Sequence, residues 1–171
     1  MIREIMVRPE RCLGCHSCEM ACAIAHTPAK NLAGALLAGQ RGLKQIYVEQ
    51  VDNFKAPVVC RHCDDAPCIA VCATHSLHRT EDGLVTNEDR QEQCLGCWMC
   101  AIACPFGMIR QDAPKRRALK CDRQCLDDKD IPACVGACPT SALVYTDVAA
   151  FEAERRRQQV ANLQAGGAAQ P

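Results

Sequence analysis

The chain has 171 residues, its 20 basic and 20 acidic residues cancel, and it combines 16 cysteines with an aromatic content of only 4%. Leucine, isoleucine, valine and phenylalanine are too thinly spread for a large core, so cysteine chemistry must stabilise the one or two small domains that this length allows. No apolar run approaches the roughly 20 residues that cross a bilayer, so we expect no direct membrane insertion.

The segments between the cysteines predict short strands, turns and helices. In chain order, we expect a strand over 2–7, a helix over 29–43, strands over 46–51, 84–86 and 142–145, and a helix over 148–163. Residues 46–51 alternate apolar and polar side chains as a half-buried strand does, and Asp82 and Gly83 indicate a turn. Residues 164–171 are small and Gly-rich, so we expect disorder there.

The cysteines fall into four groups of four with none left over, which is an internal repeat. The groups are Cys12, Cys15, Cys18 and Cys22; Cys60, Cys63, Cys68 and Cys72; Cys94, Cys97, Cys100 and Cys104; and Cys121, Cys125, Cys134 and Cys138. Groups one and three have the C-x2-C-x2-C-x3-C spacing, in which three cysteines wrap one [4Fe-4S] cube and the fourth ligates the other cluster of a pair. In each group the last two cysteines suit the start of a short helix.

Disulfide bonds and zinc sites are the alternatives to iron–sulfur ligation. Disulfides belong to oxidising compartments, and residues 1–9 lack the features of an export signal, so we expect a cytoplasmic protein that reaches a membrane only through a partner. Zinc sites prefer two close cysteine pairs separated by a longer loop, so zinc is locally plausible only in group four. With sixteen thiolates and four [4Fe-4S]²⁺ cores, the loaded chain would carry a net charge of about −8.

The residues next to the cysteines, and the motifs that the sequence lacks, further restrict the possible functions. Lys120 and Arg61 are adjacent to cysteines, where they either lie in solvent or stabilise a reduced cluster. We expect His16 and His62 not to act as ligands, because each cluster has four cysteines available, and we expect His26, His75 and His78 to be ordinary surface or turn residues. Dinucleotide-binding, Walker A and nucleophile-elbow motifs are missing, as is a basic patch with aromatic residues, which predicts neither enzyme activity nor a nucleic-acid partner.

Over about residues 1–146, these spacings resemble the four-cluster ferredoxin-type subunits of molybdopterin oxidoreductases, such as the iron–sulfur subunits of DMSO reductase and formate dehydrogenase. Residues 11–26 resemble more narrowly the iron–sulfur subunit that accepts electrons from nickel carbon monoxide dehydrogenase. The resemblance implies a loop-rich α+β fold of two ferredoxin-like dicluster halves, one inserted in the other and held by clusters. Residues 1–55 with 115–146 would form the first half, 56–114 the inserted half, and 147–171 a helix followed by a disordered tail.

The resemblance also implies how the sixteen cysteines share four [4Fe-4S] clusters, with groups one and four paired and groups two and three paired. Cluster 1 would use Cys12, Cys15, Cys18 and Cys138; cluster 2 Cys60, Cys63, Cys68 and Cys104; cluster 3 Cys94, Cys97, Cys100 and Cys72; and cluster 4 Cys121, Cys125, Cys134 and Cys22. The chain departs from the family between Cys121 and Cys125, where three residues replace the usual two. We therefore expect cluster 4 to differ in lability or potential.

The implied function is anaerobic electron transfer, from carbon monoxide dehydrogenase to a hydrogenase or another redox acceptor. The first alternative keeps the electron carrier but makes it a subunit of a formate dehydrogenase or formate–hydrogen system. A second class, an iron–sulfur redox sensor, would need an output domain that the sequence does not indicate.

Overall fold

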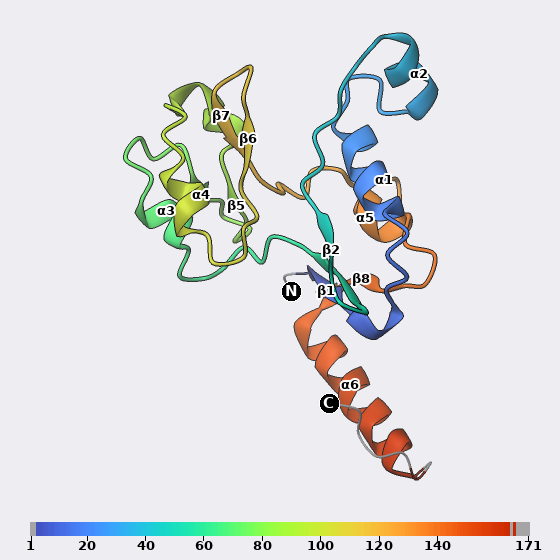
Figure 1. Cartoon of the computed structure of the whole chain (residues 1–171). Helices are drawn as coiled ribbons and strands as arrows, with labels where there is room; N and C mark the ends of the chain where they lie inside the picture. Colours follow the sequence, from blue (N-terminus) through green and yellow to red (C-terminus); the bar gives the residue numbers. More distant parts are fainter. Residues whose placement is uncertain (1–2, 165, 167–171) are drawn as a thin grey trace.

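The computed structural model describes residues 3–164 and 166 (Figure 1). Two expectations fall partly outside the described residues. They concern residue 2 of the strand expected over 2–7, and residues 165 and 167–171 of the expected disordered tail. The fold is α+β and loop-rich, as predicted, because short helices alternate with strands that form four two-stranded antiparallel sheets in the described part of the chain.

Segments from the two ends of the described chain build one body, shown in blue and orange in Figure 1. Strand β1 (Arg3–Val7) pairs with β8 (Leu143–Asp147), so that Val7 lies opposite Leu143. Helix α1 (Ser17–Ala25) packs against α5 (Ala133–Gly136), and a hairpin of β2 (Tyr47–Val51) and β3 (Phe54–Val58) lies beside them. The core of this body consists of Ile5, Cys18, Cys22, Ile46, Val59, Cys134 and Leu143.

The middle of the chain forms a second body, in green and yellow, joined to the first by two connecting segments (Figure 1). Its elements are α3 (Pro67–Ala70), β4 (His78–Arg79), β5 (Val85–Thr86), α4 (Met99–Ala103), β6 (Arg110–Asp112) and β7 (Arg117–Leu119). Strand β4 pairs with β5 and β6 with β7, while α3 packs against α4. Its core is a separate set of buried residues, namely Ala66, Cys68, Leu77, Val85, Cys100, Ile109 and Ala118.

The helix predicted over 29–43 is wrong in extent, because only α2 (Leu32–Leu37) is helical. The side chain of Asn31 caps this helix by accepting a hydrogen bond of 2.7 Å from the Gly34 N–H. The helix ends at Ala38, and Gly39 follows with a φ of 60°, a left-handed conformation that stops helices and favours glycine. Two short 3-10 helices, η1 (Pro9–Arg11) and η2 (Glu88–Gln93), lead into the first cysteines of groups one and three.

The helix predicted over 148–163 is present as α6 (Val148–Gln164), which follows β8 directly and points away from both bodies (Figure 1). Its start is held by ion pairs from Arg8 to Glu154 at 2.5 Å and from Arg155 to Glu10 at 2.5 Å. None of its residues is buried. In the part of the chain that the structure describes, no helix is long and apolar enough to cross a membrane.

Groups one and three begin with the same local backbone. Gly14 and Gly96 have φ values of 70° and 64°, and the residues before α1 and α4, His16 and Trp98, have φ values of 59° and 65°. Two left-handed residues separated by one cysteine curl the loop, so that its cysteines turn toward a common centre. A Cβ on Gly96 would lie 2.4 Å from the carbonyl oxygen of Arg116, because the turn after β6 packs on this loop.

We predict that Gly96→Ala destabilises the protein more than Gly107→Ala. Gly107 has nearly the same φ, 63°, but nothing lies within 4 Å of the position of its Cβ, so that variant carries only the cost of a left-handed alanine. The backbone clash at Gly96 adds about 1–3 kcal/mol, which corresponds to about 2–4 °C per kcal/mol in the unfolding midpoint. Thermal unfolding of the anaerobically prepared variants measures the difference, and equal midpoints would contradict the assigned loop packing.

Candidate metal centres

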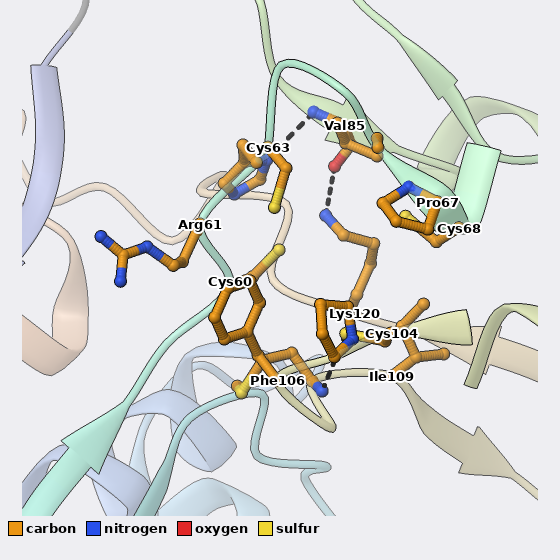
Figure 2. Close-up of a pocket in the computed structure, with 14 residues that line it drawn as sticks. Cys60, Arg61, Cys63, Pro67, Cys68, Val85, Cys104, Phe106, Ile109 and Lys120 are labelled. Atoms are coloured by element: carbon orange, nitrogen blue, oxygen red, sulfur yellow. Dashed lines mark hydrogen bonds between the residues drawn. The ribbon is translucent and has the colours of Figure 1, made fainter. Parts of the chain in front are cut away.

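Two hollows in the structure are each lined by four cysteines drawn from two groups. Site 1, in the first body, is lined by Cys12, Cys15, Cys18 and Cys138. Site 2, in the second body, is lined by Cys60, Cys63, Cys68 and Cys104 (Figure 2). In both hollows three thiols come from one cysteine group and the fourth comes from the group that the family resemblance pairs with it.

The cysteines expected to hold clusters 3 and 4 are called site 3 (Cys94, Cys97, Cys100 and Cys72) and site 4 (Cys121, Cys125, Cys134 and Cys22). In each of these sites burial and the neighbouring thiolates raise the pKa of one cysteine. The pKa of the Cys100 thiol is raised to about 11, first by burial and then by the nearby thiolates of Cys94, Cys72 and Cys97. Burial also raises the pKa of Cys134, and the charges of Cys121, Cys125 and Cys22 raise it further. In the two hollows, and in the pKa shifts of Cys100 and Cys134, the neighbouring thiols come from paired groups, while the ligand sets of the four clusters stay a prediction.

Short helices hold the exchanged cysteines in place. Cys18 of site 1 and Cys22 of site 4 both lie on α1, four residues apart, and therefore on one face of the helix. Helix α5 carries Cys134 of site 4, and Cys138 of site 1 follows just beyond its end. Because α1 packs on α5 and each helix holds cysteines of both sites, sites 1 and 4 are neighbours. Helices α3 and α4 do the same for sites 2 and 3, since Cys68 and Cys100 lie on these two packed helices.

Backbone N–H groups point at the sulfur of the last cysteine in each group, a feature that the sequence analysis missed. The donors are Gln45 to Cys22 at 3.3 Å, Leu77 to Cys72 at 3.5 Å, Met108 to Cys104 at 3.4 Å and Ala142 to Cys138 at 3.2 Å. Such hydrogen bonds favour the thiolate over the thiol. In three of the four groups the donor is four or five residues after the cysteine, where the chain turns back at the end of the helix. In two of these groups a proline directly follows the cysteine, so a Cys-Pro pair could have indicated the donor four residues after the cysteine.

The surroundings of site 2 include a buried cation and a buried imidazole. Lys120 and His62 line this hollow with exposed fractions of 4% and 5%, and Figure 2 shows the Lys120 side chain between Val85 and the cysteines. Burial, followed by the charges of Lys120 and Arg123, lowers the pKa of His62 to about 2, so the ring is neutral. Arg61, next to Cys60, is exposed and lies 5.6 Å from the centre of the Phe106 ring.

His26 lies in the turn that follows α1, and it is partly buried there. Its side chain is only 17% exposed, and its Nε2 lies 3.5 Å from Asp122 Oδ1. Its Nδ1 lies 2.7 Å from the carbonyl oxygen of Cys22. Hydrogen bonds with Asp122 and Cys22 raise the pKa of His26 to about 11, so a positive charge sits beside site 4. The extra residue between Cys121 and Cys125 is therefore accompanied by a partly buried ion pair that links this loop, through Asp122, to the end of α1.

The donor set fits iron–sulfur clusters. All sixteen cysteines are free thiols, and among the described residues no three His, Cys, Asp or Glu side chains converge as they do on a single metal ion. Four thiols around a hollow suit a cubane core, which is wider than one ion. Two buried nitrogens beside the sites, His62 Nε2 and Arg123 Nε, find no hydrogen-bond partner in the described part of the protein, and buried polar groups of this kind normally have one.

This arrangement defines a ferredoxin-type iron–sulfur protein, and comparisons with known proteins agree. A family model for the 4Fe-4S dicluster domain matches residues 51–148. The chain is 37% identical to the electron transport protein HydN of Escherichia coli K12, covering 92% of this chain and 97% of that protein. It is 37% identical to an iron–sulfur protein of Rhodospirillum rubrum, covering 92% and 90%, and 30% identical to formate hydrogenlyase subunit 2 of E. coli K12, covering 86% and 83%.

The chain therefore belongs to the 4Fe-4S dicluster family. It is an iron–sulfur electron-transport protein rather than a catalytic enzyme, and [4Fe-4S] clusters are its cofactors.

Pairs of cysteine substitutions test how the groups share their ligands. If site 1 joins Cys12 with Cys138, the variant Cys12→Ala/Cys138→Ala damages one cluster and loses about 4 of about 16 irons. The variant Cys12→Ala/Cys22→Ala removes two cysteines of the same group but damages two clusters and loses about 8 irons. Iron and sulfide analysis of anaerobic preparations measures both. The reverse order of iron losses would show that each group holds its own cluster.

Proposed function

We propose that the chain is a molecular wire with four [4Fe-4S] clusters, one at each of sites 1 to 4, ligated by the sixteen cysteines. The observation that carries the proposal is that each hollow takes three cysteines from one group and one from its paired group. The proposal divides the chain as the resemblance implies. Residues 1–55 with 115–146 form a half around sites 1 and 4, and residues 56–114 form an inserted half around sites 2 and 3.

The packing supports a linear order of clusters 1, 4, 2 and 3. Sites 1 and 4 share α1 and α5, while sites 2 and 3 share α3 and α4. The two halves meet where the charge of Cys60, in site 2, helps to raise the pKa of Cys121, in site 4. Lys120 bridges the same junction, because it lines site 2 and its Nζ donates to the carbonyl oxygen of Cys121 at 2.8 Å.

Bound clusters supply one-electron chemistry, and the protein residues determine where electrons enter and leave. Two of the sixteen cysteines, Cys15 and Cys97, are exposed, and they occupy the same position in groups one and three. They belong to sites 1 and 3, the two ends of the proposed order. Leu13 and Leu95, each two residues before an exposed cysteine, are 65% and 68% exposed. Each end of the wire thus presents a ligand and an apolar side chain on which a redox partner can dock.

For the partner, the relatives favour the formate alternative over carbon monoxide dehydrogenase. One relative is named as a subunit of formate hydrogenlyase and another as an electron transport protein, and none of the three relatives described above has carbon monoxide dehydrogenase in its name. We propose that the chain accepts electrons from a formate dehydrogenase and passes them toward a hydrogenase or a similar acceptor. The redox-sensor alternative has no support in these names.

We predict that anaerobically prepared protein contains about 16 irons per chain and that formate dehydrogenase with formate reduces its clusters rapidly. Carbon monoxide dehydrogenase with CO serves as the competing donor in the same assay. Bleaching of the visible cluster absorption in a stopped-flow instrument gives both rates. Faster reduction by the CO system would reject the formate assignment, and a zinc-loaded preparation with few irons would reject the wire.

A further inference from the structure

The second residue after the first cysteine is left-handed in all four groups. The φ values are 70° at Gly14, 45° at His62, 64° at Gly96 and 58° at Arg123. Glycine adopts this conformation freely, whereas other residues adopt it at a cost of roughly 1–2 kcal/mol. Groups one and three use glycine, but groups two and four place large polar side chains at the strained position. Strain that glycine would relieve indicates that these side chains have a function.

The His62 and Arg123 side chains are almost fully buried, with exposed fractions of 5% and 4%. The Nδ1 atom of His62 accepts a hydrogen bond of 3.0 Å from the Val85 N–H, so in the neutral ring the proton is on Nε2. That Nε2–H is without a partner in the described residues, beside the hollow of site 2. The cysteines on either side of His62 belong to site 2, so the free N–H lies where a bound cluster would offer sulfur acceptors.

Arg123 occupies the equivalent position in group four, inside the loop between Cys121 and Cys125. Its guanidinium group bonds to Glu4 and donates to the carbonyl oxygen of Arg3 at 3.1 Å, which anchors the loop to β1. Its Nε–H has no partner among the described residues. The three-residue spacing between Cys121 and Cys125 therefore accommodates a buried arginine with one unused donor on the loop that carries two cysteines of site 4.

Lys120 is the third member of this cluster of side chains. Its Nζ donates to the carbonyl oxygens of Val85 and Cys121, and its exposed fraction is 4%. Within the described residues it forms no ion pair, since both contacts are neutral carbonyls. A buried ammonium without a counter-charge is costly in free energy. A cluster with four thiolates is anionic, so clusters at sites 2 and 4 would provide the counter-charge.

We propose that the buried Lys120 ammonium, together with the unused N–H donors of Arg123 and the neutral His62, forms a junction between the two halves that stabilises the reduced clusters at sites 2 and 4. Electrons carried by the wire would then reside at its centre, between the entry and exit clusters. The proposal rests on the four-cluster wire described above. Positive charge and hydrogen bonds to sulfur both favour the more negative, reduced state of a cluster and therefore raise its potential.

The test is an EPR-monitored redox titration of the full-length, cluster-loaded protein. In Lys120→Met, we expect the two highest of the four midpoint potentials to fall. Reduction of those two clusters should become at least tenfold less favourable, which corresponds to a fall of about 59 mV for one electron. The two lower midpoints should not move. Lys30→Met removes the same charge from an exposed position and should leave all four unchanged. Lys120→Arg, which keeps the charge, should restore the wild-type values.

Arg123→Gly/Glu4→Gln provides an independent variant, in which glycine relieves the left-handed strain at position 123 and Glu4 is not left as an unpaired charge. It removes the guanidinium and its partner's charge together, and it installs the glycine that groups one and three use at this position. We expect it to lower one high midpoint, that of the site 4 cluster, and so to support the junction even if Lys120→Met loads poorly. Unchanged midpoints in loaded variants, or equal shifts of all four, would overturn the junction. Failure of the wild-type protein to hold about 16 irons would instead overturn the wire.

Discussion

Cysteines from paired groups line common hollows, and we propose that this exchange of one ligand organises the fold. A cubane needs four thiolates, and a tight loop provides only three, so the fourth must come from a distant segment. In the first body this brings the segment of Cys138 to the loop of Cys12, and it accounts for the pairing of β1 with β8 and the packing of α1 on α5. In the second body the same demand brings Cys104 to the loop of Cys60. The small sheets and short helices follow from this demand and could not form a stable core of this size alone.

Burial of so many thiols makes folding and cluster binding one process. Burial and neighbouring like charges raise the pKa of Cys100, Cys134 and Cys121, so the metal-free sites resist forming the thiolates that ligate iron. The cationic iron core offsets this repulsion. Backbone N–H groups that donate to the sulfur atoms of Cys22, Cys72, Cys104 and Cys138 stabilise the thiolates further. The same electrostatics would set potentials, because a charge that favours thiolates without iron also favours a reduced cluster.

The spacing of the cysteines predicted the cofactor, because it follows from the geometry of thiolate ligation, and the family resemblance implied the fold class. Strand and helix positions near the cysteines were also predictable, but the helix expected over 29–43 was too long, since Asn31 and Gly39 limit it locally. The burial of Lys120 and Arg123, and the ion pair of His26 with Asp122, were not predictable. Each is placed by contacts with residues far along the chain, Val85, Glu4 and Asp122, and charged side chains are normally assigned to the surface. The left-handed φ of His62 and Arg123 could have been predicted, because both residues stand two positions after the first cysteine of their group, as Gly14 and Gly96 do.

Anomalous diffraction at the iron absorption edge, from crystals grown without oxygen, would locate the clusters and their ligands. We expect four iron peaks, located at sites 1 to 4 in the order 1, 4, 2 and 3, each contacting three cysteines of one group and one of its paired group. A peak whose four ligands all come from a single group, or fewer than four iron peaks in fully loaded protein, would contradict the exchange of ligands from which the fold and the wire are derived.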